Sequence, residues 1–240
     1  MSRADTAAQL ERLLERKSGL ARSAAAAPLA RGLQELRAWQ AERLARTYAD
    51  LRLDPLAGDA LSFFLSDVYG PQDLTRRDRD VARAWQLLKR ALPPRLLEVL
   101  STAIELDVLS AELDLEMVRE LPAGPLTAQG YAQAYRAVGR AEARRRQIGF
   151  IVAIGNALTR AAHNPLAGVA LRAAHGPAHL AGFGVLQDFL ERGYAAFRKL
   201  PDAGKLLAVI EQREMRLMQI LLDGGNIAWQ EAAAGASGCG

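Results

Sequence analysis

Two carboxylates and two guanidinium groups are the side chains of this sequence whose types and spacing could do chemistry. Asp107 and Asp114 lie two helical turns apart among apolar residues when residues 95–120 are placed around a helix at about 100° per residue. The same projection puts Arg145 and Arg213 on the apolar stripes of two later segments. A buried carboxylate needs a partner or takes up a proton. We therefore predict a polar cluster of Asp107, Asp114, Arg145 and Arg213 inside a helical core.

Such a cluster has two interpretations. It could be an internal ion-pair network that fixes the register of the helices, which is the interpretation we favour. It could instead line a pocket, because helical bundles build their ligand sites from inward-facing side chains of neighbouring helices. Paired carboxylates can do acid–base chemistry, but the sequence shows no nucleophile or oxyanion hole to accompany them. No catalytic residue is predicted, and the question of whether the protein is an enzyme stays open.

Metal and nucleic-acid sites have weaker support. His175 and His179 have the i, i+4 spacing of metal ligands on a helix, but we expect Gly176-Pro177 between them to break the helix. We therefore predict no metal ion and no other cofactor. Two Arg-rich runs, at 144–146 and 76–80, could contact phosphates, but both are short and the second carries its own acids. Nucleic acid is accordingly a disfavoured partner.

Composition indicates a cellular setting. The chain has 240 residues and a formal net charge of +4, and only four of its 31 basic residues are Lys. This Arg bias suggests a GC-rich bacterial genome. The single cysteine, Cys239, cannot form an internal disulfide, which favours a reducing compartment. No apolar run resembles a signal peptide or a membrane span. We expect a soluble, cytoplasmic, bacterial protein without a membrane partner.

The elements that must position these residues are all helical, because apolar residues recur with helical periodicity and no segment alternates like a strand. We predict one all-α, helical-bundle-like domain of about seven to eight helices. Helices are expected at 29–53, 75–92, 93–121, 127–162, 165–174 and 202–222, with Thr127 as a cap. A short helix is also expected after residue 59, and another between the break at Gly176-Pro177 and about residue 200. The predicted domain spans 29–222, between a loosely attached N-terminal arm (1–28) and a mostly disordered Gly/Ala-rich tail (223–240).

One sequence motif resembles a known family. Residues 63–71 (Phe-Phe-Leu-Ser-Asp-Val-Tyr-Gly-Pro) are followed by Arg76-Arg77-Asp78, and further matches lie at 105–114, 134–148 and 186–193. This pattern is similar to the uncharacterised proteobacterial FFLEE-motif family, over roughly residues 30–222. The sequence has Ser66-Asp67 where the family name implies two acids. The resemblance implies a shared helical fold and no activity. Its motif residues here are Phe63, Phe64, Asp67 and Tyr69.

Two classes of function remain. The first is a non-catalytic helical protein that binds a protein partner or forms a homo-oligomer, stabilised by the internal Asp/Arg network. It predicts a large exposed apolar patch or a helical dimer face. The alternative is a small-molecule-binding protein or enzyme with a polar pocket between the long helices, which predicts a cavity open to solvent and a carboxylate with a perturbed pKa.

Overall fold

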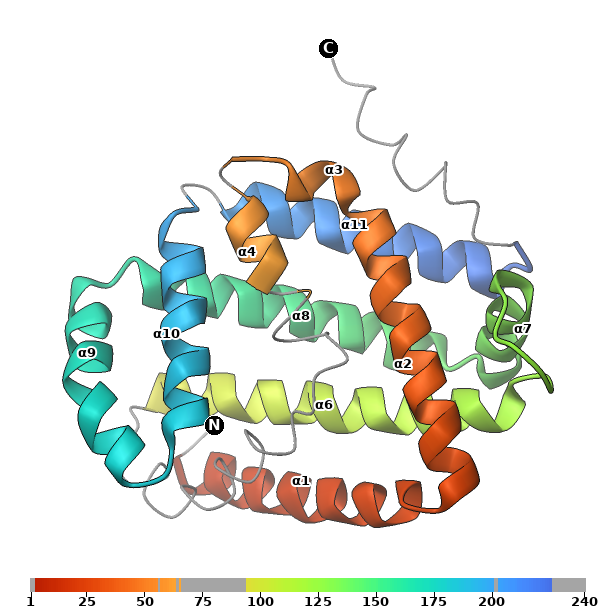
Figure 1. Ribbon diagram of the computed structural model, residues 1–240, viewed down its shortest axis with the longest axis horizontal. Coiled ribbons are helices and arrows are strands. Elements are labelled where there is room, and N and C mark those ends of the chain that lie inside the picture. The colour runs from red at the N-terminus through yellow and green to blue at the C-terminus, as the bar shows by residue number, and fades with distance from the viewer. Residues whose placement is uncertain (1–2, 56, 64, 66–93, 201–202, 226–240) are drawn as a thin grey trace.

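The computed structural model describes residues 3–55, 57–63, 65, 94–200 and 203–225, and these residues contain ten helices and no strand. The predicted all-α class is confirmed. The helices in Figure 1 are α1 (Arg3–Ala24), α2 (Ala27–Thr47), α3 (Ala49–Arg52), α4 (Gly58–Phe63), α6 (Pro94–Glu120), α7 (Ala128–Val138), α8 (Ala141–Ala162), α9 (Pro165–Leu180), α10 (Gly184–Arg198) and α11 (Ala203–Leu222). No helix among the described residues is long and apolar enough to cross a membrane.

Four long helices lie side by side in the order α1, α6, α8 and α11, and α2 crosses over them (Figure 1). Helix α10 packs against α8 and α4. Helix α9 is the outermost helix at one end of the molecule, where it packs mainly on α10 and contacts α8. Apolar side chains fill the space between the helices, and the largest buried group includes Tyr48, Leu61, Ile151, Phe197 and Leu207.

Capping residues set several helix ends. Thr127 caps α7 as predicted, because its side chain accepts a hydrogen bond from the Gly130 backbone N–H at 3.1 Å. Asn164 likewise accepts from the Leu166 backbone N–H at 3.0 Å. Pro165 follows it in the first turn of α9, where the missing proline N–H removes no helical bond. These caps place the start of α9 directly after α8.

The predicted helix over 127–162 is two helices. Gly139 and Arg140 both have positive φ, at 61° and 52°, and they separate α7 from α8. Glycine adopts this conformation at little cost, and Gly139 closes α7 by donating its backbone N–H to the Tyr135 carbonyl. Helix α8 therefore starts afresh at Ala141, and its faces do not continue those of α7.

The expected break at Gly176-Pro177 is wrong. Helix α9 continues through both residues to Leu180. Pro177 lies in the last turn, where its missing N–H removes a single backbone hydrogen bond near the exposed end of the helix. The chain turns instead at Gly182, which has a φ of 79° and lies between α9 and α10. His175 and His179 thus share one uninterrupted helix.

The segment expected to be a loosely attached arm contains α1, which is packed along α6. Leu10 and Thr6 of α1 are fully buried, and Leu10 joins Leu97 and Ile104 of α6 in an apolar cluster. We propose that α1 belongs to the helical domain, and the other domain bounds stay predictions. The expected helix at 75–92 lies outside the described residues.

Among the family-motif residues, Phe63 is buried at the end of α4. Its ring packs against Phe189 and Phe197, with centroid distances of 5.2 and 6.3 Å. The side chain joins α4 to α10, which is a packing role. The other motif residues, Phe64, Asp67 and Tyr69, lie outside the described residues.

Candidate functional site

Asp114 is a predicted site residue that lies in the interior of the molecule. Its carboxylate accepts hydrogen bonds from Arg37 Nε at 3.3 Å and from Gln40 Nε2 at 3.1 Å, both on α2. Burial raises the pKa of Asp114, and the attraction of Arg37 and the hydrogen bond of Gln40 only partly oppose this shift. The carboxylate therefore joins α6 to α2, with donors on both of its oxygens.

Asp107 is not buried in the core, contrary to the prediction. Its side chain is 37% exposed, and its Oδ2 lies 2.5 Å from Lys17 Nζ of α1. The stripe of α6 on which Asp107 projects is covered by α1, which the sequence predicts to be part of a loosely attached arm. Asp107 and Asp114 consequently bind different helices.

Arg145 is not a core residue either, whereas its neighbour Arg144 is. Arg145 is exposed and pairs with Glu142 on its own helix at 3.4 Å. Arg144 is buried, and its guanidinium lies 4.2 Å from the centre of the Tyr135 ring, a cation–π distance. The error follows from the break at Gly139 and Arg140, because a projection through one long helix assigns α8 the wrong faces.

Arg213 has a largely buried side chain, as predicted, but its partner is Asp50 rather than Asp107 or Asp114. Arg213 donates to both Asp50 oxygens, at 2.8 and 2.6 Å, and to the Thr47 carbonyl at 2.8 Å. The Arg213 hydrogen bond lowers the pKa of Asp50. This bidentate pair joins α11 to the end of α2 and to α3. The four predicted residues therefore each have a different partner.

The sequence projection missed a second buried pair. Arg43 Nη1 donates to Glu214 Oε1 at 2.5 Å, and the Tyr48 hydroxyl donates to the same oxygen at 2.8 Å. Burial and the nearby carboxylate raise the pKa of the Tyr48 hydroxyl. Applying the same projection to α2 finds Arg43, because Leu36, Arg43 and Thr47 lie on its buried stripe. The predicted four-residue cluster therefore does not form, and the interior polar contacts include residues that the projection did not select.

These interior contacts hold pairs of helices together. They link α2 to α6 through Asp114 and α2 to α11 through Glu214, and Arg144 joins α8 to α7 through Tyr135. Three buried guanidinium nitrogens, Nε of Arg43 and Nε and Nη2 of Arg144, have no hydrogen-bond partner among the described residues. The carboxylates are engaged by arginine or by amide donors, so we assign no acid–base chemistry to them.

An open cavity lies elsewhere, where the end of α8 meets α9 and α10. Its volume is about 430 Å³, and its lining consists of Ala162, His163, Pro165, Val169, Arg172, Tyr194 and Arg198. Both Arg172 and Arg198 are exposed. Two guanidinium groups and a phenol around one cavity can bind an anionic group. No predicted site residue lines this cavity.

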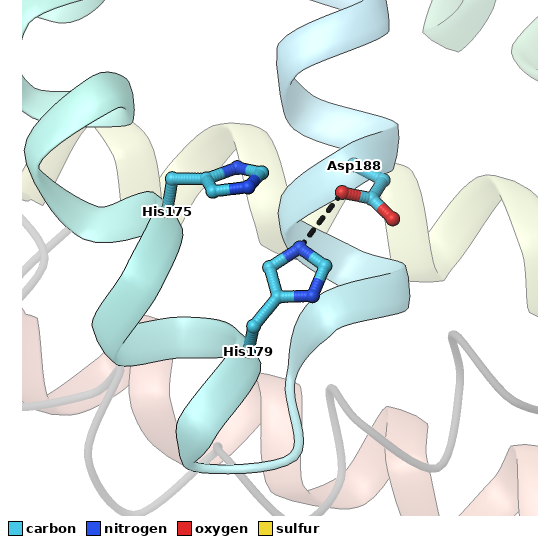
Figure 2. A group of neighbouring side chains, drawn as sticks. All are labelled: His175, His179 and Asp188. Atoms are coloured by element: carbon cyan, nitrogen blue, oxygen red, sulfur yellow. Dashed lines mark hydrogen bonds and ion pairs between the residues drawn. The ribbon is translucent and has the colours of Figure 1, made fainter.

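A second feature of the same helix pair is a group of histidine and carboxylate side chains. His175 and His179 project from α9 towards α10, which carries Asp188 (Figure 2). His179 Nε2 lies 2.9 Å from Asp188 Oδ1, and His175 Nδ1 lies 2.9 Å from Glu191 Oε1. The prediction missed this group because it placed a helix break at Pro177.

The outward side of α9 is a third feature, which we name the α9 face. Large apolar side chains are exposed there, with Leu166 at 72%, Val169 at 55% and Leu180 at 92%. The small or apolar residues between them are also exposed: Ala170, Ala173, Gly176 and Pro177. The polar residues of α9, Arg172, His175 and His179, lie off this stripe, on the side towards α10.

The fold and interior contacts define an all-α protein whose long helices are linked by buried ion pairs. Residues 20–227 match the model of a family described as "Domain of unknown function (DUF8198)", and the chain belongs to this family. The match begins inside α1 and includes every later helix of the described residues. No curated protein and no solved structure matches the chain. The family assigns a shared domain and leaves the function open.

Proposed function

We propose that this protein works by self-assembly, with the α9 face as the surface through which two copies bind. The observation that carries the proposal is the exposure of Leu166, Val169 and Leu180 along one uncharged side of an outermost helix. Contiguous exposed apolar surface is typical of sites where one protein binds another. The exposed patch agrees with what the interaction hypothesis predicts from the sequence.

The pattern of residues on α9 supports a helix–helix contact. Residues 166, 169, 173, 176 and 180 recur at intervals of three or four and fall on one stripe of the helix. Ala and Gly between the larger side chains allow a second helix to approach closely, with ridges packing into grooves. A charged residue at any of these positions would lose its water on docking, and none of them is charged.

A second copy of the chain is the occupant that the charge pattern favours. An uncharged apolar face requires a matching apolar surface. Of the six large apolar side chains exposed in the described part of the chain, five lie on α9 and α10: Leu166, Val169, Leu180, Val185 and Leu190. Among the described residues, the matching apolar surface is therefore the same face of another copy, and pairing across a two-fold axis buries both at once.

Sedimentation velocity over a concentration series tests this proposal. The wild type should dimerise, and Leu166→Glu and Leu180→Glu should each shift it towards monomer, because each places a charge inside the buried contact. Leu53→Glu is the matched control. Leu53 is 86% exposed but lies outside the α9–α10 pair, so this variant should assemble like the wild type.

Three results would overturn the proposal. They are a wild type that stays monomeric at every concentration, Glu variants of α9 that assemble normally, and a Leu53→Glu variant that dissociates as readily as they do. Circular dichroism of each variant checks that the fold is intact. A heterologous partner on the α9 face would appear as a monomeric wild type, which counts against self-assembly.

A second candidate function is binding of a small anionic molecule in the cavity beside Arg172 and Arg198. The supporting observation is that neither guanidinium forms an ion pair with a described residue, although both line a cavity of about 430 Å³. Inorganic phosphate should raise the melting temperature of the wild type. Arg172→Gln and Arg198→Gln should lose this shift, while Arg145→Gln retains it. An equal shift in all three variants contradicts a site in this cavity.

The finer assignments from the sequence stay proposals. Residues 63–71 support membership of the proteobacterial FFLEE-motif family. The Arg bias supports a bacterial source, and the single cysteine supports a cytoplasmic location. Fractionation of cells that express the protein, followed by immunoblotting, tests the location. Recovery in the membrane or secreted fraction would count against it.

A further inference from the structure

His175, His179 and Asp188 form a group of metal-ligating side chains between α9 and α10, on the side of α9 turned away from the α9 face. Each residue offers one ligand atom, and these atoms all lie within 4.8 Å of one another. In Figure 2 both imidazoles project from α9 to the side on which α10 carries Asp188. Residues from two helices therefore converge on one small volume at the surface.

We propose that this group binds a first-row divalent transition metal ion, with Zn²⁺ as the expected occupant. Two imidazoles and one carboxylate suit Zn²⁺ and its neighbours, whereas Mg²⁺ and Ca²⁺ prefer oxygen ligands alone. Ligand atoms about 2.0–2.2 Å from a tetrahedral zinc ion lie about 3.4 Å apart. The present separation of at most 4.8 Å needs small rotations of side chains that are about half exposed.

The spacing of the histidines is what makes the site possible. Residues at i and i+4 of one helix are neighbours on its surface, and the two imidazole centroids are 4.5 Å apart. This arrangement depends on α9 continuing through Gly176 and Pro177. The cluster rests on helix geometry rather than on a loop, so its backbone positions are fixed before an ion binds.

A neighbouring hydrogen bond determines which ring nitrogen of His175 is left to bind the ion. A carboxylate can only accept, so His175 Nδ1 carries the hydrogen that it shares with Glu191 at 2.9 Å. The neutral ring then has its lone pair on Nε2, which is free to bind the ion. Buried Gln187 donates to the same Glu191 oxygen at 2.8 Å and holds the carboxylate in place. Metal-bound histidines are commonly oriented by a carboxylate in this way.

His179 and Asp188 form the other half of the site. In the metal-free molecule His179 Nε2 and Asp188 Oδ1 are 2.9 Å apart and share a hydrogen. On metal binding the neutral ring would adopt its other tautomer, with its one hydrogen on Nδ1, and His179 Nε2 and Asp188 Oδ1 would become ligands. Three protein ligands leave a fourth position, and the exposed imidazoles leave it open to water or an exchangeable ligand.

Cobalt binding to the full-length protein tests the site directly. The protein should carry Cys239→Ser so that the thiol cannot bind the ion. Titration with Co²⁺ should give visible d–d absorption that saturates at one equivalent and disappears when Zn²⁺ is added. His179→Ala should weaken Co²⁺ binding strongly, and Glu191→Gln by about tenfold, the lower end of effects seen for residues that orient a ligand. His163→Ala is the matched control, because His163 is the third histidine of the chain and lies outside the cluster.

Gly184→Ala probes the position of His179 without removing a ligand. A Cβ at Gly184 would lie 2.6 Å from His179 Nδ1, so the alanine should displace the ring and weaken Co²⁺ binding. Absence of saturable absorption, or equal weakening by His163→Ala and His179→Ala, would overturn the proposal. The ligands are not residues of the α9 face. The Leu166→Glu and Leu180→Glu variants should therefore bind Co²⁺ normally, and failure of either proposal leaves the other intact.

Discussion

Arg43 and Glu214 form a buried ion pair that joins α2 to α11 across 171 positions of the sequence. Both side chains are largely buried, and the Tyr48 hydroxyl donates to the same Glu214 oxygen. The pair therefore fixes two distant helices relative to each other. Its contribution to stability depends on both members being present, because either charge alone would be buried without a counter-charge.

Glu214→Ala should destabilise the protein by about 3–5 kcal/mol, because it strands the buried Arg43 guanidinium. Chemical denaturation measures the loss. The double variant Arg43→Met/Glu214→Leu removes both charges and should recover much of it. The control is Arg145→Ala, whose exposed pair with Glu142 should contribute at most about 1 kcal/mol. A Glu214→Ala variant as stable as this control would show that the pair is not buried.

Asp114→Asn should change the pH dependence of stability. Burial raises the pKa of Asp114 in the folded protein, so the folded state holds its proton more tightly than the unfolded chain does. Ionisation of Asp114 therefore lowers the free energy of unfolding as the pH rises above about 4, the ordinary aspartate range. The free energy of unfolding of Asp114→Asn minus that of the wild type should therefore be larger at neutral pH than at about pH 4. If the variant and the wild type differed in stability by the same amount at both pH values, the raised pKa of Asp114 would be contradicted.

Asp50→Asn should show the opposite sign. The hydrogen bond from Arg213 lowers the pKa of Asp50, so this carboxylate stabilises the fold at neutral pH and the contribution is lost as the pH falls below the ordinary aspartate pKa. The effect should be about 0.2–1 kcal/mol, because the carboxylate is partly exposed. Unfolding curves of wild type and variant should converge in acid. If they diverge further there, the pair does not act as described.

A pair of glycine substitutions in α8 separates packing from helix propensity. A Cβ at Gly155 would lie 2.4 Å from a terminal carbon of Leu207, which is buried in the α8–α11 contact. Gly155→Ala should therefore cost about 1–3 kcal/mol. A Cβ at Gly149 would have no atom of the described residues within 4 Å, so Gly149→Ala should stabilise by about 0.5–1 kcal/mol. Thermal unfolding compares the two, and stabilisation by both would contradict the close packing.

The sequence was sufficient to predict the all-α class and the positions of many helices, because apolar periodicity and caps such as Thr127 act locally. It was insufficient for the buried network. Arg144 and Arg145 exchanged roles because the positive φ angles at Gly139 and Arg140 restart the helix. The Arg43–Glu214 pair depends on which helices meet, and the pattern of a single helix does not contain that information.

The histidine cluster shows a different limit. The i, i+4 spacing of His175 and His179 was visible in the sequence, but Pro177 suggested a break. Whether a proline ends a helix depends on how many backbone hydrogen bonds are lost around it. In the last turn of α9 only one is lost. Asp188 and Glu191 could not be paired with the histidines until the turn at Gly182 placed α10 beside α9.

The position of α11 has a consequence for folding during synthesis. Helix α11 packs along α8 and contacts α7, and it supplies the Glu214 and Arg213 partners of α2 and α3. A ribosome releases these residues only after every other described helix has emerged. Until then the apolar side of α8 and the Arg43 guanidinium lack their final covering. The nascent chain is therefore expected to reach its native core late, when non-local contacts with α11 can close.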